Sequence, residues 1–238
     1  MKILAVDSSA LVASAALCED ERLLAEYTLN NKNTHSETLL PMIESLLSFF
    51  SLEVGDVDIF AVSSGPGSFT GVRIGAATVK GLAFASEKPC VGVSTLEALA
   101  YNLRFYKGLI CPVMNARRSQ VYTALFRSDG KNVTRLMPDS AMAISELDAV
   151  LADYSKGEEV ALVGDGYNIT EQGFYKTALR YVPERLRHQS AFSVAEVALK
   201  CYRDGNYGTD SELCVDYLRP SQAERERAER EQAEKTDT

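Results

Sequence analysis

A glycine-rich segment at residues 65–75 (GPGSFTGVRIG) constrains the fold of this chain more than any other feature. It follows a short apolar run at 59–62 and precedes residues with helical periodicity. A strand, a glycine-rich turn and a helix start form an anion-binding arrangement, because the first N–H groups of a helix lack intrahelical partners. The segment lacks the Gly-Lys-Ser/Thr ending of a P-loop, and its one cation is Arg73. A helix capped by Ser68 explains the same residues without a ligand.

Composition and charge exclude several classes of protein. The 238 residues are 46% hydrophobic, which allows one domain or two compact lobes with a buried core. No apolar run reaches about 18 residues, and Asp7 comes too early for a signal peptide, so we expect a cytoplasmic protein without membrane contact. The five cysteines have no metal-ligand spacing, which favours reduced, buried thiols. A net charge of −8 argues against a stand-alone nucleic-acid binder, although a partner or a local patch at Arg117 and Arg118 could contact one.

The order of predicted elements is nearly the same in the two halves of the chain. The first half predicts strands at 3–6, 11–18 and 22–29, a helix from about 35 to 50, a strand at 59–63, a helix at 69–85, a strand at 90–93 and a helix at 95–103. The second half predicts strands at 109–114, 120–127 and 132–137, a helix at 145–154, a strand at 159–163 and helices at 170–180 and 193–203.

Two βββαβα-type lobes from one chain predict an α/β protein of the actin-like ATPase and sugar-kinase (ASKHA) superfold, with a reduced second lobe. We place the N-terminal lobe at 1–106 and the C-terminal lobe at 107–219. The charged segment 220–238 has no apolar stripe, so we expect a solvated helix or a disordered tail there.

An ATPase of this superfold needs an acidic residue and glycines in a phosphate-binding hairpin at the start of each lobe. The first candidate loop offers Asp7 and Ser8 but no glycine, and the second loop, at 115–119, has neither an acid nor a glycine. Gly164 and Gly166 lie in a loop that resembles the nucleoside-binding position of such proteins. These four named residues are the candidate cofactor-binding residues. Asp7 and Ser8 could equally form a cap or a turn.

Metal-ligand and nucleophile patterns are weak in this chain. His35 begins a predicted helix, and Leu39 occupies the i+4 position where a second metal-binding histidine would stand. We therefore expect no metal site and a local hydrogen bond at His35. Ser68 lies in no nucleophile elbow and has no histidine or acid paired with it by motif. We accordingly predict no catalytic residue.

Several segments make the chain similar to the bacterial TsaB (YeaZ) family, over nearly its whole length apart from the tail. The glycine-rich segment at 65–75 is the most specific of them. The other matching segments are 3–9 (ILAVDSS), 35–41 (HSETLLP), 80–82 (KGL), 164–166 (GDG) and 217–219 (YLR). The chain departs from the family at Asn115, where the family often has aspartate, and this removes a carboxylate from the 115–119 loop.

The resemblance implies a non-catalytic partner and activator of the related enzyme TsaD. With the ATPase TsaE, these proteins make the threonylcarbamoyl modification on the adenosine next to the anticodon of certain tRNAs. ATP and metal would be used by the partner proteins, and this chain would carry no cofactor of its own. We expect a heterodimer with TsaD through helices of the N-terminal lobe, a homodimer when TsaD is absent, and contact with tRNA only within the complex.

We predict that the partner interface uses the helices at 35–50 and 69–85. The small residues of the second helix let another helix approach closely, although such residues more often pack inside the same protein. The predicted interface residues are His35, Leu39, Ile43, Gly67, Ser68, Phe69, Thr70, Val72, Arg73 and Ala76. Two other functions stay open, a nucleotide-dependent ATPase or kinase of the same superfold and a metalloprotease, as in older glycoprotease descriptions of relatives.

Overall fold

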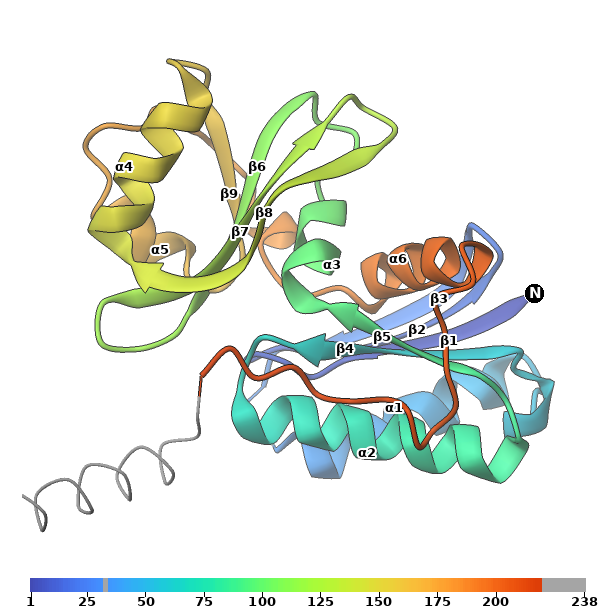
Figure 1. Ribbon diagram of the computed structural model, residues 1–238. Coiled ribbons are helices and arrows are strands. Elements are labelled where there is room, and N and C mark those ends of the chain that lie inside the picture. Colours follow the sequence, from blue (N-terminus) through green and yellow to red (C-terminus); the bar gives the residue numbers. More distant parts are fainter. Residues whose placement is uncertain (32–33, 220–238) are drawn as a thin grey trace, which may run out of the picture.

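The computed structural model describes residues 1–31 and 34–219, which form two lobes around two five-stranded sheets (Figure 1). The first sheet has the order β3-β2-β1-β4-β5, formed by β1 (Lys2–Asp7), β2 (Ala13–Glu19), β3 (Arg22–Leu29), β4 (Ile59–Gly65) and β5 (Cys90–Ser94). The strands β1 to β3 pair antiparallel, whereas β4 is parallel to β1 and β5 is parallel to β4.

The second sheet repeats this topology. Its order is β10-β9-β6-β7-β8, formed by β6 (Gly108–Asn115), β7 (Gln120–Ser128), β8 (Val133–Ala143), β9 (Val160–Val163) and β10 (Leu179–Arg180). Here β6, β7 and β8 pair antiparallel, and β9 and β10 continue in parallel from β6. The repetition confirms the predicted α/β class and the ASKHA superfold. The predicted tail at 220–238 lies outside the described residues.

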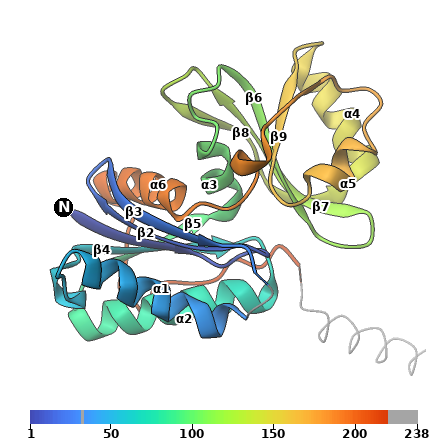
Figure 2. The same ribbon diagram turned by 180° about the vertical axis from the view of Figure 1, so that it is seen from behind.

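Helices cover both faces of the first sheet (Figure 2). On one face lie α1 (His35–Phe49) and α2 (Phe69–Ser86), and on the other lie α3 (Thr95–Tyr101) and α6 (Ala191–Arg203). The second lobe adds α4 (Ile144–Ser155) and α5 (Tyr167–Glu171), and short 3₁₀ turns occur at Val54–Asp56 and Glu184–Leu186. Among the described residues, no helix combines the length and apolar character that a membrane span requires.

The position of α6 corrects the predicted lobe assignment. Residues 107–219 were expected in the second lobe, but α6 packs on the first sheet, where Val194 and Ala198 join Ile3 and Ala5 in one buried cluster. The physical reason is that α1 and α2 cover one face of that sheet and leave apolar side chains on the other. An amphipathic helix from the end of the chain removes these side chains from water.

The predicted helix at 170–180 is also wrong beyond Glu171. The carboxylate of Asp148 on α4 accepts hydrogen bonds from the backbone N–H groups of Tyr175, Lys176 and Thr177 at 2.9 to 3.2 Å. Burial alone would raise the pKa of Asp148, but these donors outweigh it and lower the pKa. The N–H groups that a helix would bond internally are therefore taken by a side chain, and the segment leads into β10 instead.

A polar cluster and an apolar cluster join the two lobes. Arg135 on β8 donates to Glu97 on α3 at 2.9 Å and also bonds Asp139. Asp139 in turn accepts from Ser94, the N-cap of α3, at 2.6 Å. Beneath this network, side chains of α3 pack with side chains of β6 and β7 in a shared core. The helix α3 therefore fixes the position of the second sheet relative to the first.

A largely buried ion pair holds the turn after α3 against α6. Arg104 lies 2.6 Å from the carboxylate of Glu196, whose side chain is only 7% exposed. Burial raises the pKa of Glu196 to about 7, and the attraction of Arg104 offsets only part of this effect. The charged form of Glu196 is therefore less stable in the folded chain than in water.

Glu196→Gln is expected to remove part of the pH dependence of stability. Because the folded pKa is raised above 4.5, the carboxyl contributes stability below that pH and loses it as the pH rises through about 7. The free energy of unfolding of the variant, relative to the wild type, should rise by on the order of 2 kcal/mol across this interval. Urea denaturation at pH values below 4.5 and above about 7 measures this change. If the stabilities of the wild type and the variant depend on pH in the same way, the raised pKa of Glu196 is contradicted.

Candidate functional site

The glycines of the 65–75 segment allow α2 to lie directly on the turn after β1. A Cβ atom at Gly71 would stand 2.0 Å from the carbonyl oxygen of Ser8, and one at Gly75 would stand 2.6 Å from its hydroxyl oxygen. A Cβ at Gly67 would stand 2.5 Å from the carbonyl oxygen of Ser9. These approaches are too short for any side chain. The glycines therefore serve backbone-to-backbone packing within the chain.

The start of α2 is capped from within the protein. The hydroxyl of Ser68 accepts from the N–H of Gly71 at 3.3 Å, and the N–H of Ser68 donates to the carbonyl of Ser9 at 2.6 Å. The predicted N-cap is therefore confirmed, and the turn of residues 8 and 9 takes one of the donors that an anion would need. The sequence of this loop suggested an anion-binding turn. In the structure, the loop bonds to the turn after β1 of its own sheet.

Asp7 points into the protein rather than into a cleft. Its side chain is buried and accepts from the N–H and the hydroxyl of Ser9 at 2.8 and 2.7 Å, and from the hydroxyl of Ser63. Burial raises the pKa of Asp7, and these donors oppose the rise. The hydroxyl of Ser8 donates to the carbonyl of Gly71 at 2.9 Å. Asp7 and Ser8 therefore form the turn that the sequence allowed as an alternative to cofactor binding.

The glycines of the 164–166 loop have the same packing role in the second lobe. A Cβ on Gly164, where φ is +117°, would lie 2.2 Å from the carbonyl oxygen of Val113, and one on Gly166 would lie 2.9 Å from it. Between them, Asp165 accepts from the N–H of Asn115 at 3.2 Å. The carboxyl of Asp165 is in contact with solvent in a cleft between the two lobes. The protein around it still buries the group enough to raise its pKa.

The loop at 115–119 adopts an unusual backbone. Arg117, Arg118 and Ser119 all have φ between 54° and 62°, a left-handed conformation that costs non-glycine residues about 1 kcal/mol each. The side chain of Asn115 accepts from the N–H of Arg117 at 2.8 Å and holds the turn. No sequence signal predicted this conformation, because none of the three is glycine.

A cleft of about 680 Å³ lies between the lobes. It is lined by Ser9, residues 66–70, residues 114–117, Tyr122, Asp165 and residues 216–219. The structure thus brings the glycine-rich segment, the 115–119 loop and Asp165 to one place, as the superfold predicts. The contribution of 216–219 was missed, because a short segment without periodicity gives no sign of where it packs.

The metal and thiol predictions concern other sites. His35 lies 2.7 Å through Nε2 from the carbonyl oxygen of Ala10, so it forms a hydrogen bond as expected, but with a residue 25 positions earlier and not with a local partner. Within residues 1–31 and 34–219, no three His, Cys, Asp or Glu side chains gather as a metal site. Burial raises the pKa of both Cys18 and Cys111 to about 12, whereas Cys214 is exposed and departs from the expected burial.

Four residues of the predicted partner interface are buried in the lobe itself. Leu39, Ile43, Val72 and Ala76 face the first sheet, so they support the helices and offer no surface to a partner. The helical period explains the error, because the apolar positions that mark the two helices also form the core. The interface prediction stays open for the remaining members, and Ser68, Phe69, Thr70 and Arg73 are exposed.

The exposed side of α2 forms a continuous stripe that the prediction did not single out. It contains Phe69, Arg73, Ala77, Gly81 and Phe84 at helical spacing. Phe84 is 73% exposed, and a Cβ at Gly81 would meet nothing within 4 Å. The middle of the stripe is therefore flat, with an aromatic ring at each end.

Gly71→Ala and Gly81→Ala should change stability in opposite directions. The added methyl group at Gly71 collides with a backbone carbonyl and should cost about 3 kcal/mol of unfolding free energy or more. The same change at Gly81, where space is open, should stabilise the helix by up to about 1 kcal/mol. Urea denaturation of both variants tests this, and equal stabilities would show that α2 does not dock on the Ser8 carbonyl as described.

The chain is similar to several known proteins. The family described as TsaD, tRNA N6-adenosine threonylcarbamoyltransferase, matches residues 22–224. The tRNA threonylcarbamoyladenosine biosynthesis protein TsaB of Bacillus subtilis is 34% identical over 192 residues, which cover 77% of this chain and 83% of that protein. Its namesake in Escherichia coli is 35% identical over 135 residues, 56% of this chain and 58% of that protein.

A solved structure agrees with these sequence similarities. YeaZ from Pseudomonas aeruginosa has a TM-score of 0.75 to this chain at 26% identity, over 91% of this chain and 100% of that one. The similarity extends over both lobes and confirms the resemblance inferred from the glycine-rich segment. On these grounds the chain belongs to the TsaB (YeaZ) family, within a broader group related to TsaD.

Proposed function

We propose that this chain is the non-catalytic subunit that binds and activates TsaD. Its family places it in tRNA threonylcarbamoyladenosine biosynthesis. The observation that carries the proposal is the exposed stripe on α2, which is flat in the middle and aromatic at both ends. Such a stripe suits the close approach of a helix from another subunit.

The polar side chains that could act in catalysis form hydrogen bonds within the chain. This supports a non-catalytic role. The carboxylate of Asp7 is occupied by Ser9 and Ser63, and the ring of His35 is occupied by the carbonyl of Ala10. A general acid, a base or a metal ligand has to reach a substrate or an ion, and these groups bond to the protein instead. We infer that the chemistry resides in TsaD.

An apolar side chain on α1 extends the proposed interface. Leu40 is 55% exposed, and α1 packs beside α2 on the same face of the first sheet. An exposed apolar side chain on the neighbouring helix would enlarge the apolar area of the contact. The same surface could pair with itself across a two-fold axis, which would give the homodimer expected when TsaD is absent.

Activation in this scheme is a shift between conformations of TsaD. A bound subunit favours one conformation of its partner only by binding that conformation more tightly. The remaining assignments follow from this scheme: TsaE uses ATP, TsaD holds the metal, tRNA meets the chain only within the complex, and the complex works in the cytoplasm.

Ala77→Glu should weaken binding to TsaD and activation of the tRNA modification by about tenfold or more, because it places a charge in the flat middle of an apolar contact. Ala178→Glu, the same change at an exposed position of the second lobe, should leave both unchanged. Modification of tRNA is assayed with purified TsaD and TsaE, with and without each variant. A full rate from TsaD and TsaE alone would contradict the activator role, and equal behaviour of the two variants would place the interface elsewhere.

The interlobe cleft favours one alternative function, a nucleotide-dependent ATPase or kinase. The cleft lies where this superfold binds nucleotide, and Asp165 offers a carboxylate at its wall. Calorimetric titration of the isolated chain with ATP and magnesium separates the two functions. Tight binding, with turnover lost in Asp165→Asn, would favour the enzyme over the activator.

A further inference from the structure

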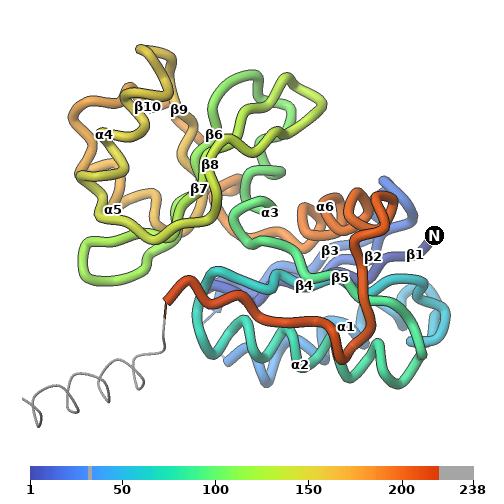
Figure 3. The backbone as a smooth tube through the Cα atoms, viewed as in Figure 1, coloured from blue at the N-terminus to red at the C-terminus, as the bar shows by residue number. Residues whose placement is uncertain are grey.

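After α6, the chain passes the β5 edge of the first sheet and continues along α2 as an extended segment, residues 206–219, which we call the strap (Figure 3). Gly208 and Cys90 exchange two backbone hydrogen bonds of 2.9 and 3.0 Å at the edge of β5. Leu213 is buried in the core beneath α2, and the N–H of Asp216 donates to the carbonyl of Ser64 at 2.8 Å. The strap is therefore an ordered part of the lobe.

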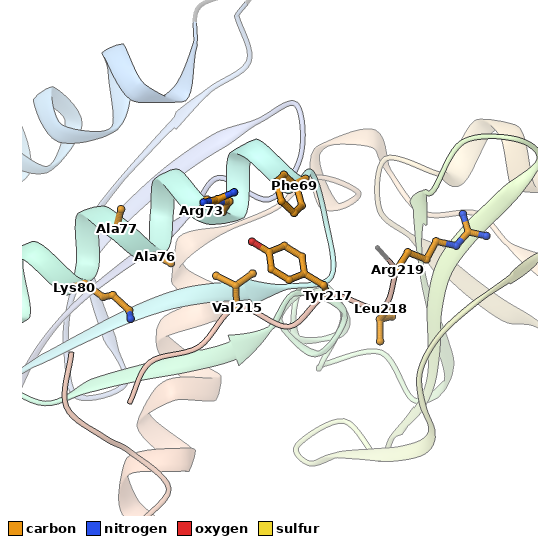
Figure 4. A pocket seen from close by; sticks show the side chains of 9 residues that line it. All are labelled: Phe69, Arg73, Ala76, Ala77, Lys80, Val215, Tyr217, Leu218 and Arg219. Atoms are coloured by element: carbon orange, nitrogen blue, oxygen red, sulfur yellow. The ribbon is translucent and has the colours of Figure 1, made fainter. Parts of the chain in front are cut away.

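The last residues of the strap lie beside the start of α2 (Figure 4). The ring of Tyr217 stacks on Phe69 with 4.8 Å between centroids, and the guanidinium of Arg73 lies 5.1 Å from the same ring. Arg219 continues toward the second lobe, where it donates to the carbonyl of Ala116 at 3.3 Å. The strap thus extends alongside α2, and among the residues of the exposed stripe it stacks on Phe69 at one end.

A groove of about 830 Å³ lies between α2 and the strap. Phe69, Arg73, Ala76, Ala77 and Lys80 line it from α2, and Val215, Tyr217, Leu218 and Arg219 line it from the strap. Three of these side chains are cationic and none is acidic, although the whole chain has a net charge of −8.

The three cations of the groove are not neutralised by carboxylates of the described chain. In the ranges 1–31 and 34–219, the ion pairs include none of Arg73, Lys80 and Arg219. The strap carries the carboxylates of Asp210, Glu212 and Asp216, and none of them forms an ion pair with these cations. Glu212 accepts from the N–H of Thr209 at 2.9 Å, which holds it in a turn of the strap. Within the described residues, the cations that line the groove are therefore free of direct ion pairs.

We propose that α2 and the strap form one docking groove, and that TsaD fills it with a segment that carries carboxylate side chains. The inference rests on the proposed function and adds the chemistry of the contact. The small, exposed side chain of Ala77 leaves room for the backbone of the partner, and guanidinium groups pair with carboxylates through parallel hydrogen bonds. The rings of Phe69 and Tyr217 supply the apolar part of the contact.

The test compares two double variants with the same change in net charge. Arg73→Glu with Lys80→Glu should weaken binding of the full chain to purified TsaD by about 100-fold at low salt, because attraction becomes repulsion. Lys131→Glu with Lys176→Glu, at exposed positions of the second lobe, should change it by less than about threefold. Calorimetry at about 50 mM and about 300 mM salt measures both, and the wild-type affinity should fall with salt more steeply than that of the groove variant.

The possible outcomes distinguish failure of the proposed groove from failure of the proposed function. No binding of the wild-type chain to TsaD would overturn both. Wild-type binding with equal affinities for the two double variants would overturn the groove and leave the function standing. A groove variant that loses self-association in sedimentation but keeps its affinity for TsaD would show that a second copy of the chain is the occupant.

A change in the strap tests whether it forms one wall of the groove. Tyr217→Ala should weaken binding to TsaD by about tenfold, because it removes the ring stacked on Phe69. Tyr175→Ala, which removes an 88% exposed ring from the second lobe, is the matched control. Equal affinities, with both variants shown to be folded by circular dichroism, would limit the docking surface to α2.

Discussion

The contact between the backbone of α2 and the turn after β1 determines how the rest of the first lobe can be used. Gly67, Gly71 and Gly75 bring the helix so close that carbonyl and hydroxyl oxygens of the turn occupy the space of side chains. The turn then points Asp7 inward and takes the N–H of Ser68. Groups that could bind an anion or a metal thus hold the helix in place. The opposite side of α2 stays exposed and is available to another protein.

Local patterns predicted most of the fold, because they report on local causes. The repeated order of strands and helices follows from hydrophobic periodicity, and the cap at Ser68 follows from short-range chemistry. Three features depend on distant partners and were missed or misassigned. The packing of α6 on the first sheet depends on an uncovered face, the loss of helix after Glu171 depends on Asp148, and the strap is held by Cys90 and other residues distant in sequence.

The interface residues show where sequence reasoning about a site fails. An amphipathic helix reveals which of its positions are apolar, and those positions are mostly the ones that the protein buries. Leu39 and Val72 are apolar positions of this kind and are buried, whereas Ala77, Gly81 and Phe84 lie on the side that solvent reaches. Only the packing of α2 on its own sheet shows which face of the helix stays exposed to solvent. In this chain, therefore, the glycine-rich segment that resembles a ligand loop holds α2 on its own sheet.

Backbone hydrogen exchange of the chain, alone and bound to TsaD, tests the central claim most directly. The account predicts slower exchange on binding in the exposed parts of α1 and α2 and in residues 215–219, with the loops at 115–119 and 164–166 unchanged. Slower exchange confined to those two loops, with α1, α2 and the strap unaffected, would show that the partner or its substrate engages the interlobe cleft. That result would contradict a chain that works through its docking surface.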